Sequence, residues 1–442
     1  MNTIIYVQER KPAPLSADVF NAVPNEFWRA ADCTVAWSTV DSEWTVSAGD
    51  TVGISRLATP TGNVTISITS KFADADIFYL ADYAFGQQHE ALRLLDFDSV
   101  TVDAVKSDAT ACLLLWHVGA VKRFASRWLG RDYRSRTQVL DGSIRGKVMI
   151  GSYVKKHLAA GEASRIPCRI IERTQDTPNN RILKAGLRYI ANLAHSLPVA
   201  GARQAILHQV NATLPRFAQV SEIKPTPADI RSISAKGAQR HYGPILRSTL
   251  DLLGHRFITD RAGDHEIRSF MWQMPILFQE SVRGLVSAID GLVLDATRTA
   301  RASILDSDGN RLRTARVDPD LVIRDSSGQT LILDTKYKHA LPQATATGEE
   351  LIAFTGNERV KIVRSDIYQA VAYRQHDAWD NAETGLVYPV CLPHEEPTPK
   401  PMRIHGFGKP VVLLFMDIGP HARKNNHAFC SQLRQLVADG DR

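Results

Sequence analysis

The chain has 442 residues, of which 44% are hydrophobic and 23% charged, a composition that excludes an intrinsically disordered protein and predicts two or three domains. Its 53 lysine and arginine residues against 47 aspartate and glutamate residues give a formal charge of +6, which permits a nucleic-acid partner without requiring one. Five widely spaced cysteines without a C-x-x-C pair exclude a zinc ribbon, and no apolar run is long enough to span a bilayer. We therefore expect a cytoplasmic protein with reduced thiols and no membrane partner.

The predicted elements divide the chain into three domains. Residues 1–110 contain the alternating stretch GNVTISITSKF followed by a helical segment, which predicts a small, mainly β interaction domain. Residues 111–265 carry apolar side chains at helical spacing, as in NNRILKAGLRYIANLAHSL, which predicts a helical linker or docking region. Residues 266–442 alternate helices and strands, which predicts a mixed sheet flanked by helices. The expected fold class is α/β, in a multidomain α+β arrangement.

The third domain should contain, in order, a helix, a β-hairpin, a second helix and two strands. FMWQMPILFQESVRGLVSAI and SDIYQAVAYRQHDAW have the spacing of helices, whereas LVYPVCL and PVVLLFMDI are short apolar runs typical of buried strands. The polar stretch at about 340–360 is expected to be a loop.

The hairpin PDLVIRDSSGQTLILDTKYK is the most informative segment of the sequence. Two short runs of branched apolar residues flank the turn sequence DSSG, in which Gly328 takes the left-handed position. A turn centred on Ser327 places Asp320 opposite Asp334, and Lys336 then projects from the same face as Asp334. Directly opposed carboxylates repel each other, so this arrangement needs a cation or a shared proton.

Two carboxylates beside a lysine have the composition of a metal-dependent hydrolytic site. The oxygens of Asp320 and Asp334, with the backbone carbonyl of Thr335, suit Mg²⁺ or Mn²⁺, and Lys336 would orient a water or stabilise developing negative charge. Such a site suits hydrolysis of a phosphodiester. A surface hairpin with a cross-strand ion pair accounts for the same spacing equally well, so spacing alone leaves both interpretations open.

Two further patterns have a functional and an ordinary interpretation. Gln369 and Tyr373 share one face of a predicted helix, from which they would hold the lysine or reach a DNA backbone; ordinary helix packing is the alternative. Arg123, Arg127 and Arg131 recur at four-residue spacing, which suits contact with phosphates or with an acidic partner surface; a solvated helix face is the alternative.

Together, Pro319-Asp320, Asp334-Thr335-Lys336 and the helix with Gln369 and Tyr373 resemble the PD-(D/E)xK nuclease superfamily. More closely, the chain resembles the McrC family, the nuclease subunits of McrBC modification-dependent restriction systems, through GNVTISITSKF, SIRGKVMI and DTPNNRILKAGLRYI. The resemblance implies a restriction-endonuclease-like C-terminal domain. It also implies Asp320 and Asp334 as metal ligands, Lys336 as the catalytic lysine, and Gln369 and Tyr373 as supporting residues.

The chain departs from this family at two places. The family usually has an acidic residue in an L-F-E pattern on the preceding helix, but Gln279 occupies that position here. Glu280 is the neighbouring candidate, although it points about 100° away around the helix. Ser70 also precedes Lys71 where a proline is more typical.

The resemblance implies a Mg²⁺-dependent DNA endonuclease that leaves a 3′-hydroxyl and a 5′-phosphate. It also implies a partner, an AAA+ GTPase resembling McrB that forms a hexameric ring, translocates DNA and is stimulated by this subunit. The chain lacks the pattern G-x-x-x-x-G-K-[ST] and is therefore not itself such a motor. Two alternatives stay open: a catalytically weak scaffold that activates an NTPase ring, and a stand-alone structure-specific nuclease.

Overall fold

A computed structural model shows two compact units. The first comprises residues 1–116, 196–205 and 255–442, and the second comprises residues 117–195 and 206–254. Helices combined with mixed sheets confirm the predicted α/β class, while the predicted boundaries near residues 110 and 265 stay a prediction. The structure describes residues 2–59, 62–72, 74–85, 105, 108–254, 261–262, 265–295, 299–305, 311–325, 328–339, 350–355, 358–379 and 382–438.

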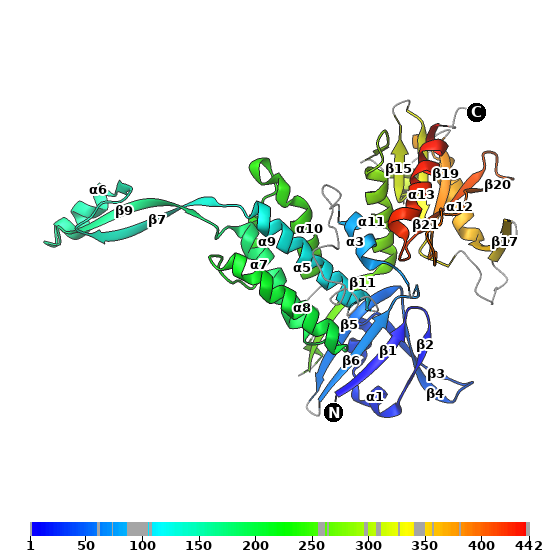
Figure 1. Ribbon diagram of the computed structural model, residues 1–442, viewed down its shortest axis with the longest axis horizontal. Helices are drawn as coiled ribbons and strands as arrows, with labels where there is room; N and C mark the ends of the chain where they lie inside the picture. Colours follow the sequence, from blue (N-terminus) through cyan, green and yellow to red (C-terminus); the bar gives the residue numbers. More distant parts are fainter. Residues whose placement is uncertain are drawn as a thin grey trace. The chain divides into compact units, whose positions relative to one another are not determined.

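A five-stranded sheet in the order β1-β6-β5-β11-β10 organises the N-terminal part of the first unit (Figure 1). β1 and β6 are parallel, and the other neighbours are antiparallel. GNVTISITSKF forms β6 as predicted, because its alternating Val64, Ile66 and Ile68 face the core. The bounds are β1 Asn2–Gln8, β5 Thr51–Thr59, β6 Gly62–Thr69, β10 Arg261–Ala262 and β11 His265–Gln273.

A small antiparallel sheet in the order β2-β4-β3 completes this N-terminal part. Its residues share one hydrophobic core with the larger sheet and with the buried Phe27 and Trp28 of α2. The predicted helix after β6 is α3. The bounds are β2 Pro12–Leu15, α1 Ala17–Ala22, α2 Asn25–Ala30, β3 Cys33–Ser38, β4 Glu43–Ala48 and α3 Ile77–Ala84.

The segment FMWQMPILFQESVRGLVSAI was predicted as one helix, and this prediction is wrong at its start. Its first four residues belong to β11, where Trp272 pairs with Val52. Helix α11 (Met274–Ser287) begins only afterwards. Pro275 fits this boundary, because it lies in the first turn of the helix, where a residue without a backbone N–H is tolerated, and the N-cap residue Gln273 is extended.

The C-terminal part of the first unit is built on a six-stranded mixed sheet in the order β12-β15-β16-β19-β21-β20 (Figure 1). β16, β19 and β21 are parallel, and the strands at both sides are antiparallel. The predicted hairpin is β15–β16, and the two later predicted strands are β19 and β21. The bounds are β12 Val293–Leu294, β15 Leu321–Arg324, β16 Thr330–Thr335, β19 Glu383–Val390, β20 Met402–Ile404 and β21 Val411–Asp417.

The central strands of this sheet are buried on both faces. Helix α12 (Arg364–Arg374), which was predicted, packs Ile367 and Ala370 against one face. All seven residues of β21 are buried, so the alternate residues on its opposite face are covered as well. Helices α11 and α13 (Ala422–Ala438) pack against strands of this sheet. These near-continuous apolar strands explain why the sequence pattern identified them correctly.

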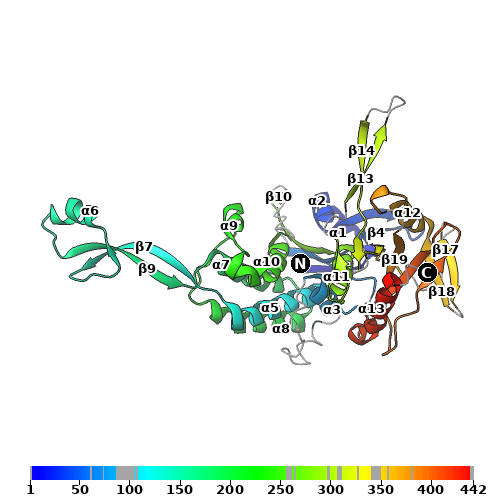
Figure 2. The ribbon, with the colours of Figure 1, turned by 90° about the horizontal axis from the view of Figure 1, so that it is seen from above.

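Two antiparallel pairs lie outside the large sheets (Figure 2). The stretch at 340–360, predicted as a loop, in fact contains most of one of these pairs: its residues 350–355 and 358–360 lie in β17 and β18. Residues 340–349 fall outside the described residues. The bounds are β13 Ala300–Leu305, β14 Arg311–Val317, β17 Glu350–Thr355 and β18 Glu358–Val363.

The second unit combines the predicted helices with a long β-hairpin that the prediction of a helical middle region did not include. β7 and β9 pair along ten residues each, and Figure 1 shows them as a long ribbon with α6 near its far end. The two predicted helices, α5 and α7, are present. No helix within the described ranges is long and apolar enough to cross a membrane. The bounds are α5 Ala109–Trp128, β7 Asp132–Asp141, β8 Lys147–Val148, α6 Ile150–Ser152, β9 Arg165–Thr174, α7 Pro178–Ala194, α8 Ala200–Thr213, α9 Pro227–Ser232 and α10 Gly243–Gly254.

Candidate nuclease site

The β15–β16 hairpin has the register that the sequence predicts. Leu321 pairs with Leu333, so Asp320, directly before β15, falls opposite Asp334. Gly328 has φ +90°, the left-handed conformation expected at the turn. Ser327, the predicted centre of the turn, lies outside the described residues. The hairpin therefore brings the two predicted carboxylates to the same end of the sheet.

Asp334 is the buried centre of the site, with only 3% of its surface exposed. Tyr373 Oη donates a hydrogen bond to Asp334 Oδ1 at 3.1 Å, and the Lys336 ammonium contacts Oδ2 as an ion pair. Burial raises the pKa of Asp334, and the negative charge of Asp320 raises it further, while Lys336 and Tyr373 counteract both effects. A buried carboxylate in this position needs nearby positive charge to stay ionised.

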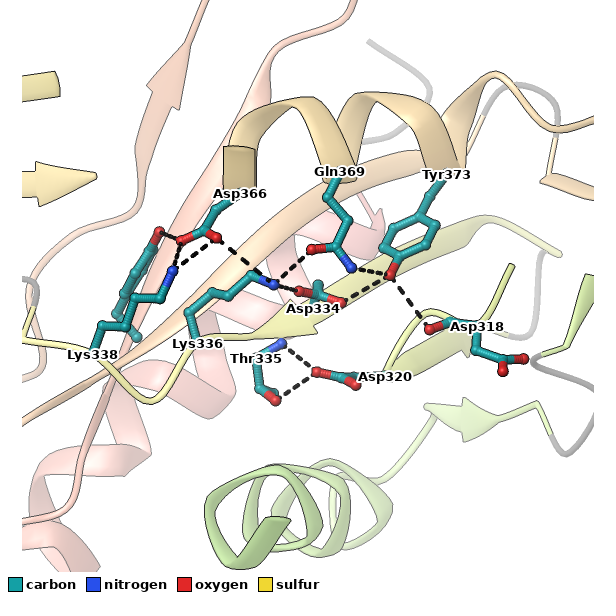
Figure 3. A network of polar contacts seen from close by, with 10 residues as sticks. Asp318, Asp320, Asp334, Thr335, Lys336, Lys338, Asp366, Gln369 and Tyr373 are labelled. Carbon is teal, nitrogen blue, oxygen red and sulfur yellow. Dashed lines mark hydrogen bonds and ion pairs between the residues drawn. The ribbon is translucent and has the colours of Figure 1, made fainter. Parts of the chain in front are cut away.

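Lys336, Gln369 and Tyr373 form a continuous chain of hydrogen bonds beside Asp334 (Figure 3). Lys336 Nζ donates to Gln369 Oε1 at 2.8 Å, and Gln369 Nε2 donates to Tyr373 Oη at 2.6 Å. Gln369 and Tyr373 are one helical turn apart on α12, which lies across β16 and β19. Helix α12 thus binds the lysine through Gln369 and the Asp334 carboxylate through Tyr373.

Asp320 is held by the end of the neighbouring strand. Its Oδ2 accepts the backbone N–H of Thr335 at 2.7 Å and the Thr335 hydroxyl at 2.6 Å (Figure 3). These two bonds fix the carboxylate beside β16. Asp320 is half-buried and Gln369 is exposed, so the site is open to solvent on one side while Asp334 lies at its base.

Asp366 and Lys338 extend the network, although the sequence interpretation gave them no role. Both carboxylate oxygens of Asp366 contact Lys338 Nζ, at 3.0 and 2.9 Å, and Oδ2 also accepts the Tyr388 hydroxyl at 3.2 Å. Lys336 Nζ lies 3.9 Å from Asp366 Oδ1. The only signal for Lys338 in the sequence is its position two residues after Lys336. The partner on α12 is 28 residues away and has no local signal.

The other predicted residues belong to helix α11 and to the second unit. Glu280 on α11 has an ion pair with Arg283 at 3.7 Å. Gln279, at the position where the resemblance expects an acid, is half-buried. The predicted arginine stripe belongs to the second unit. Arg123 is half-buried on α5, whereas Arg127 and Arg131 are exposed; Arg131 follows the end of the helix.

The donor set of the site fits a hard divalent cation. Asp334 and Asp320 supply carboxylate oxygens at neighbouring positions, and the negative charge of Asp320 disfavours ionisation of Asp334, a repulsion that a cation would relieve. Asp334 Oδ2 is buried and, apart from its ion pair with Lys336, has no hydrogen-bond partner among the described residues. Mg²⁺ commonly binds one or two carboxylates and keeps several waters, so two protein ligands are sufficient. No group of three or more His, Cys, Asp or Glu suited to a metal occurs in the described part.

Comparison with known proteins places this architecture in a family. A solved assembly of McrB AAA+ hexamers with bound McrC from Thermococcus gammatolerans contains a chain with 14% identity and a TM-score of 0.56; the match covers 98% of this chain and 100% of that one. The McrBC complex of the same organism, solved by cryo-EM, matches at 14% identity and a TM-score of 0.42 over 65% of this chain and 88% of that chain. At such identities the first likeness shows the fold. No curated protein matches the chain significantly.

The family itself is shown by sequence. The family model described as "McrBC 5-methylcytosine restriction system component" matches residues 46–389, which include most of the N-terminal sheet, the whole second unit and the candidate site through β19. The chain belongs to this McrBC restriction-system family.

Proposed function

We propose that this protein is the DNA endonuclease subunit of a McrBC-like restriction system and that it hydrolyses phosphodiesters with Mg²⁺ or Mn²⁺. One observation carries the proposal: Lys336 and Tyr373 both bind a buried carboxylate, Asp334, near the end of strand β16. A hairpin that merely displayed a surface ion pair would leave Asp334 exposed. Burial of the group, with its pKa raised, is the pattern expected of a functional carboxylate.

Asp320 and Asp334 would hold the cation, with the Thr335 carbonyl as a further oxygen at the end of β16. When bound, the cation supplies Lewis-acid polarisation of a phosphate and lowers the pKa of a coordinated water. Lys336 would bring its ammonium to the scissile phosphate, where it orients the attacking water or stabilises the charge that develops. Gln369 would position this lysine, and the hydrogen bond from Tyr373 favours the ionised form of Asp334.

The proposed partner is an AAA+ GTPase ring resembling McrB, and DNA is the proposed substrate. In the first solved structure above, McrC is bound to McrB AAA+ hexamers. The β7–β9 hairpin is the surface of this chain best suited to such docking. Residues 132–174 contain nine lysines and arginines against four aspartates and glutamates, so a net +5 of the chain's +6 lies here. The hairpin also exposes large apolar side chains, among them Tyr133 (71%), Ile144 (66%), Ile150 (70%) and Ile171 (66%).

The second candidate function is a scaffold that activates the ring without efficient cleavage. Two observations favour it: Glu280 pairs with Arg283 instead of extending the site, and the Lys336 ammonium already compensates the charge of Asp334. The burial and hydrogen bonding of Asp334 oppose it, because an unused buried carboxylate is a net loss of stability. A stand-alone structure-specific nuclease is disfavoured by the exposed apolar surface of the β7–β9 hairpin.

The test is a cleavage assay with the full chain, the partner NTPase, GTP, Mg²⁺ and either methylated or unmethylated DNA. Wild type is compared with Asp334→Ala and with Asp290→Ala, a control in an exposed turn. We expect wild type and the control to cut while Asp334→Ala does not, and all three to stimulate the NTPase. Equal cutting by Asp334→Ala refutes the site. Stimulation without cutting by any of the three supports the scaffold.

A further inference from the structure

Three strands of the N-terminal sheet end at one edge, and polar residues gather there. β1 and β6 run parallel, while β5 runs antiparallel to β6, so the ends of the first two meet the start of the third. Glu9 follows β1, Asp50 precedes β5, and Ser70 and Lys71 follow β6. We call these four residues with Tyr337 the edge cluster. Glu9 is 2% exposed, Ser70 is 9% exposed, and the side chain of Lys71 is 12% exposed. A polar cluster buried to this degree needs a structural explanation.

Tyr337, the residue directly after Lys336, inserts into this edge. It is 5% exposed, its hydroxyl lies 2.9 Å from Ser70 Oγ, and it donates to Glu9 Oε2 at 3.5 Å. Its ring has Phe72 and Phe278 as neighbours, at centroid distances of 5.1 and 6.0 Å. Ser70 and Tyr337 are 267 residues apart along the chain. The end of the candidate catalytic strand is therefore anchored in the N-terminal sheet.

Lys71 makes the central contacts of the edge cluster. Its ammonium donates to the backbone carbonyl of Tyr337 at 2.7 Å and to Asp50 Oδ1 at 3.2 Å, and it lies 4.3 Å from the centre of the Tyr337 ring. Its backbone N–H donates to Glu9 Oε2 at 2.9 Å. Burial lowers the pKa of Lys71, while Asp50 and Glu9 counteract that effect and favour the charged form.

The backbone at Tyr337 explains why this anchoring matters for the site. Lys336 N–H still bonds the Val387 carbonyl at 2.9 Å, as a continuation of the β16–β19 pairing. The next bond, from Lys338 N–H to the Lys336 carbonyl at 2.8 Å, closes a tight turn with Tyr337 at its centre. The chain therefore bends sharply between the two lysines of the candidate site. Lys71 binds the carbonyl of the residue that forms this turn.

We propose that Lys71 is a positioning residue of the nuclease site: by binding the turn at Tyr337, it sets the direction from which Lys336 and Lys338 enter the site. This inference rests on the proposed function. It gives the N-terminal sheet a part in positioning the site, in addition to the interaction role predicted for it. It also gives Ser70 a purpose, because the serine hydroxyl bonds Tyr337 and accepts the Phe72 N–H at 3.1 Å, which a proline in its place would not do.

The experiment measures kcat and KM for DNA cleavage by the full chain with its partner NTPase, GTP and Mg²⁺. The variants are Lys71→Met, Lys71→Arg and Tyr337→Phe, with Lys11→Met as the control, since Lys11 is an exposed lysine just beyond the end of β1. A displacement of about 1 Å at a reacting group lowers rates by up to about 100-fold, so we expect Lys71→Met to lose at least about tenfold in kcat. KM should stay within about twofold, and Lys71→Arg should recover part of the rate.

Folding and NTPase stimulation separate positioning from a general structural effect. We expect Lys71→Met to keep its far-ultraviolet circular dichroism and its stimulation of the NTPase, and Tyr337→Phe, which retains the carbonyl bonded by Lys71, to lose less than Lys71→Met. A folded Lys71→Met with wild-type kcat overturns the inference. So does a loss of NTPase stimulation in parallel with kcat. Should Lys71→Met not fold, a loss of about tenfold or more in kcat in a folded Tyr337→Phe overturns the inference, because that variant keeps the carbonyl that Lys71 binds. If Asp334→Ala also cuts normally, the proposed function fails together with the inference; if only Asp334→Ala is inactive, the inference alone fails.

Discussion

Replacing Tyr373 with phenylalanine removes one hydroxyl that contacts three neighbours, of which the Asp318 carbonyl, at 3.4 Å, is the most distant. That hydroxyl donates to Asp334 Oδ1 at 3.1 Å and accepts from Gln369 Nε2 at 2.6 Å. The ring itself packs edge-on to Trp379 and remains in the variant. Gln369→Leu is the matched change, because it removes the bond to Lys336 but leaves the bond from Tyr373 to Asp334. The two substitutions therefore separate support of the lysine from support of the carboxylate.

The expected magnitudes differ because the two contacts differ in burial. Asp334 is buried, and a hydrogen bond to a buried charged group contributes about 1.5–3 kcal/mol, so the loss of the Tyr373 hydrogen bond raises the pKa of Asp334 further. Asp334 acts as the carboxylate, so activity falls as the pH drops through its pKa. Tyr373→Phe should then move the acid limb of the pH–activity profile, the part in which activity falls with falling pH, to higher pH. Gln369 is exposed, water can replace it, and its loss should cost about 1 kcal/mol, roughly fivefold in kcat.

The assay is the pH dependence of kcat between about pH 5 and 9 for wild type, both single variants and the double variant. We expect the acid limb to shift in Tyr373→Phe and in the double variant, and to stay in place in Gln369→Leu. The double variant should be no more than about twofold slower than Tyr373→Phe, because the loss of Tyr373 already releases Gln369. The reasoning is refuted by a Tyr373→Phe limb that coincides with that of wild type, or by additive losses in the double variant.

Three further outcomes follow from the structure. Chelation by EDTA should abolish cleavage, and added Mg²⁺ or Mn²⁺ should restore it; cleavage that persists in EDTA contradicts the proposed cation site. His117 is buried against Thr249, and burial lowers its pKa to about 3. Below pH 6.5 the imidazole therefore stays neutral in the folded protein, whereas it becomes protonated in the unfolded chain. As the pH falls from 7.5 to 5, protonation of the unfolded chain should lower the free energy of unfolding by about 2 kcal/mol. His117→Gln should remove this pH dependence in urea titrations, and an unchanged pH dependence in the variant contradicts the prediction. Asn180→Ala should accelerate hydrogen exchange at the root of the β7–β9 hairpin and lower NTPase stimulation severalfold while the Asp334 site stays intact; unaltered exchange would show that the root is held by other contacts.

The hairpin of the site was predictable because its local signals agree with one another. Branched apolar runs, a turn with a glycine in the left-handed position and the two-residue alternation of side chains fix the register, and the register places Asp320 opposite Asp334. Gln369 and Tyr373 followed from helical spacing once their helix was recognised. Each of these inferences uses residues within one element or in two consecutive elements.

The contacts that organise the site across elements had no such signal. Lys71 and Tyr337 are 266 residues apart, and neither residue is unusual for its own segment. The pairing of Lys338 with Asp366 likewise depends on where α12 crosses the sheet. Patterns of hydrophobicity give the face of an element but not the element that packs on it, so a buried polar contact of this kind becomes visible only when the sheet is assembled.

The β7–β9 hairpin escaped prediction for a different reason, which bears on its role. Sequence alternation arises where one face of a strand is buried, but nine of the ten residues of β7 are exposed, so no binary pattern could form. A two-stranded ribbon is marginally stable on its own. This one is secured at its root, where Asn180 Nδ2 donates to the carbonyls of Gly130 and Gln175, at 3.0 and 2.7 Å, just outside the two strands. Tyr242 Oη donates to Asn180 Oδ1 at 2.6 Å. The exposure of its apolar side chains is the property on which the proposed docking rests, and the same property leaves the strand without the alternating pattern by which strands are usually recognised.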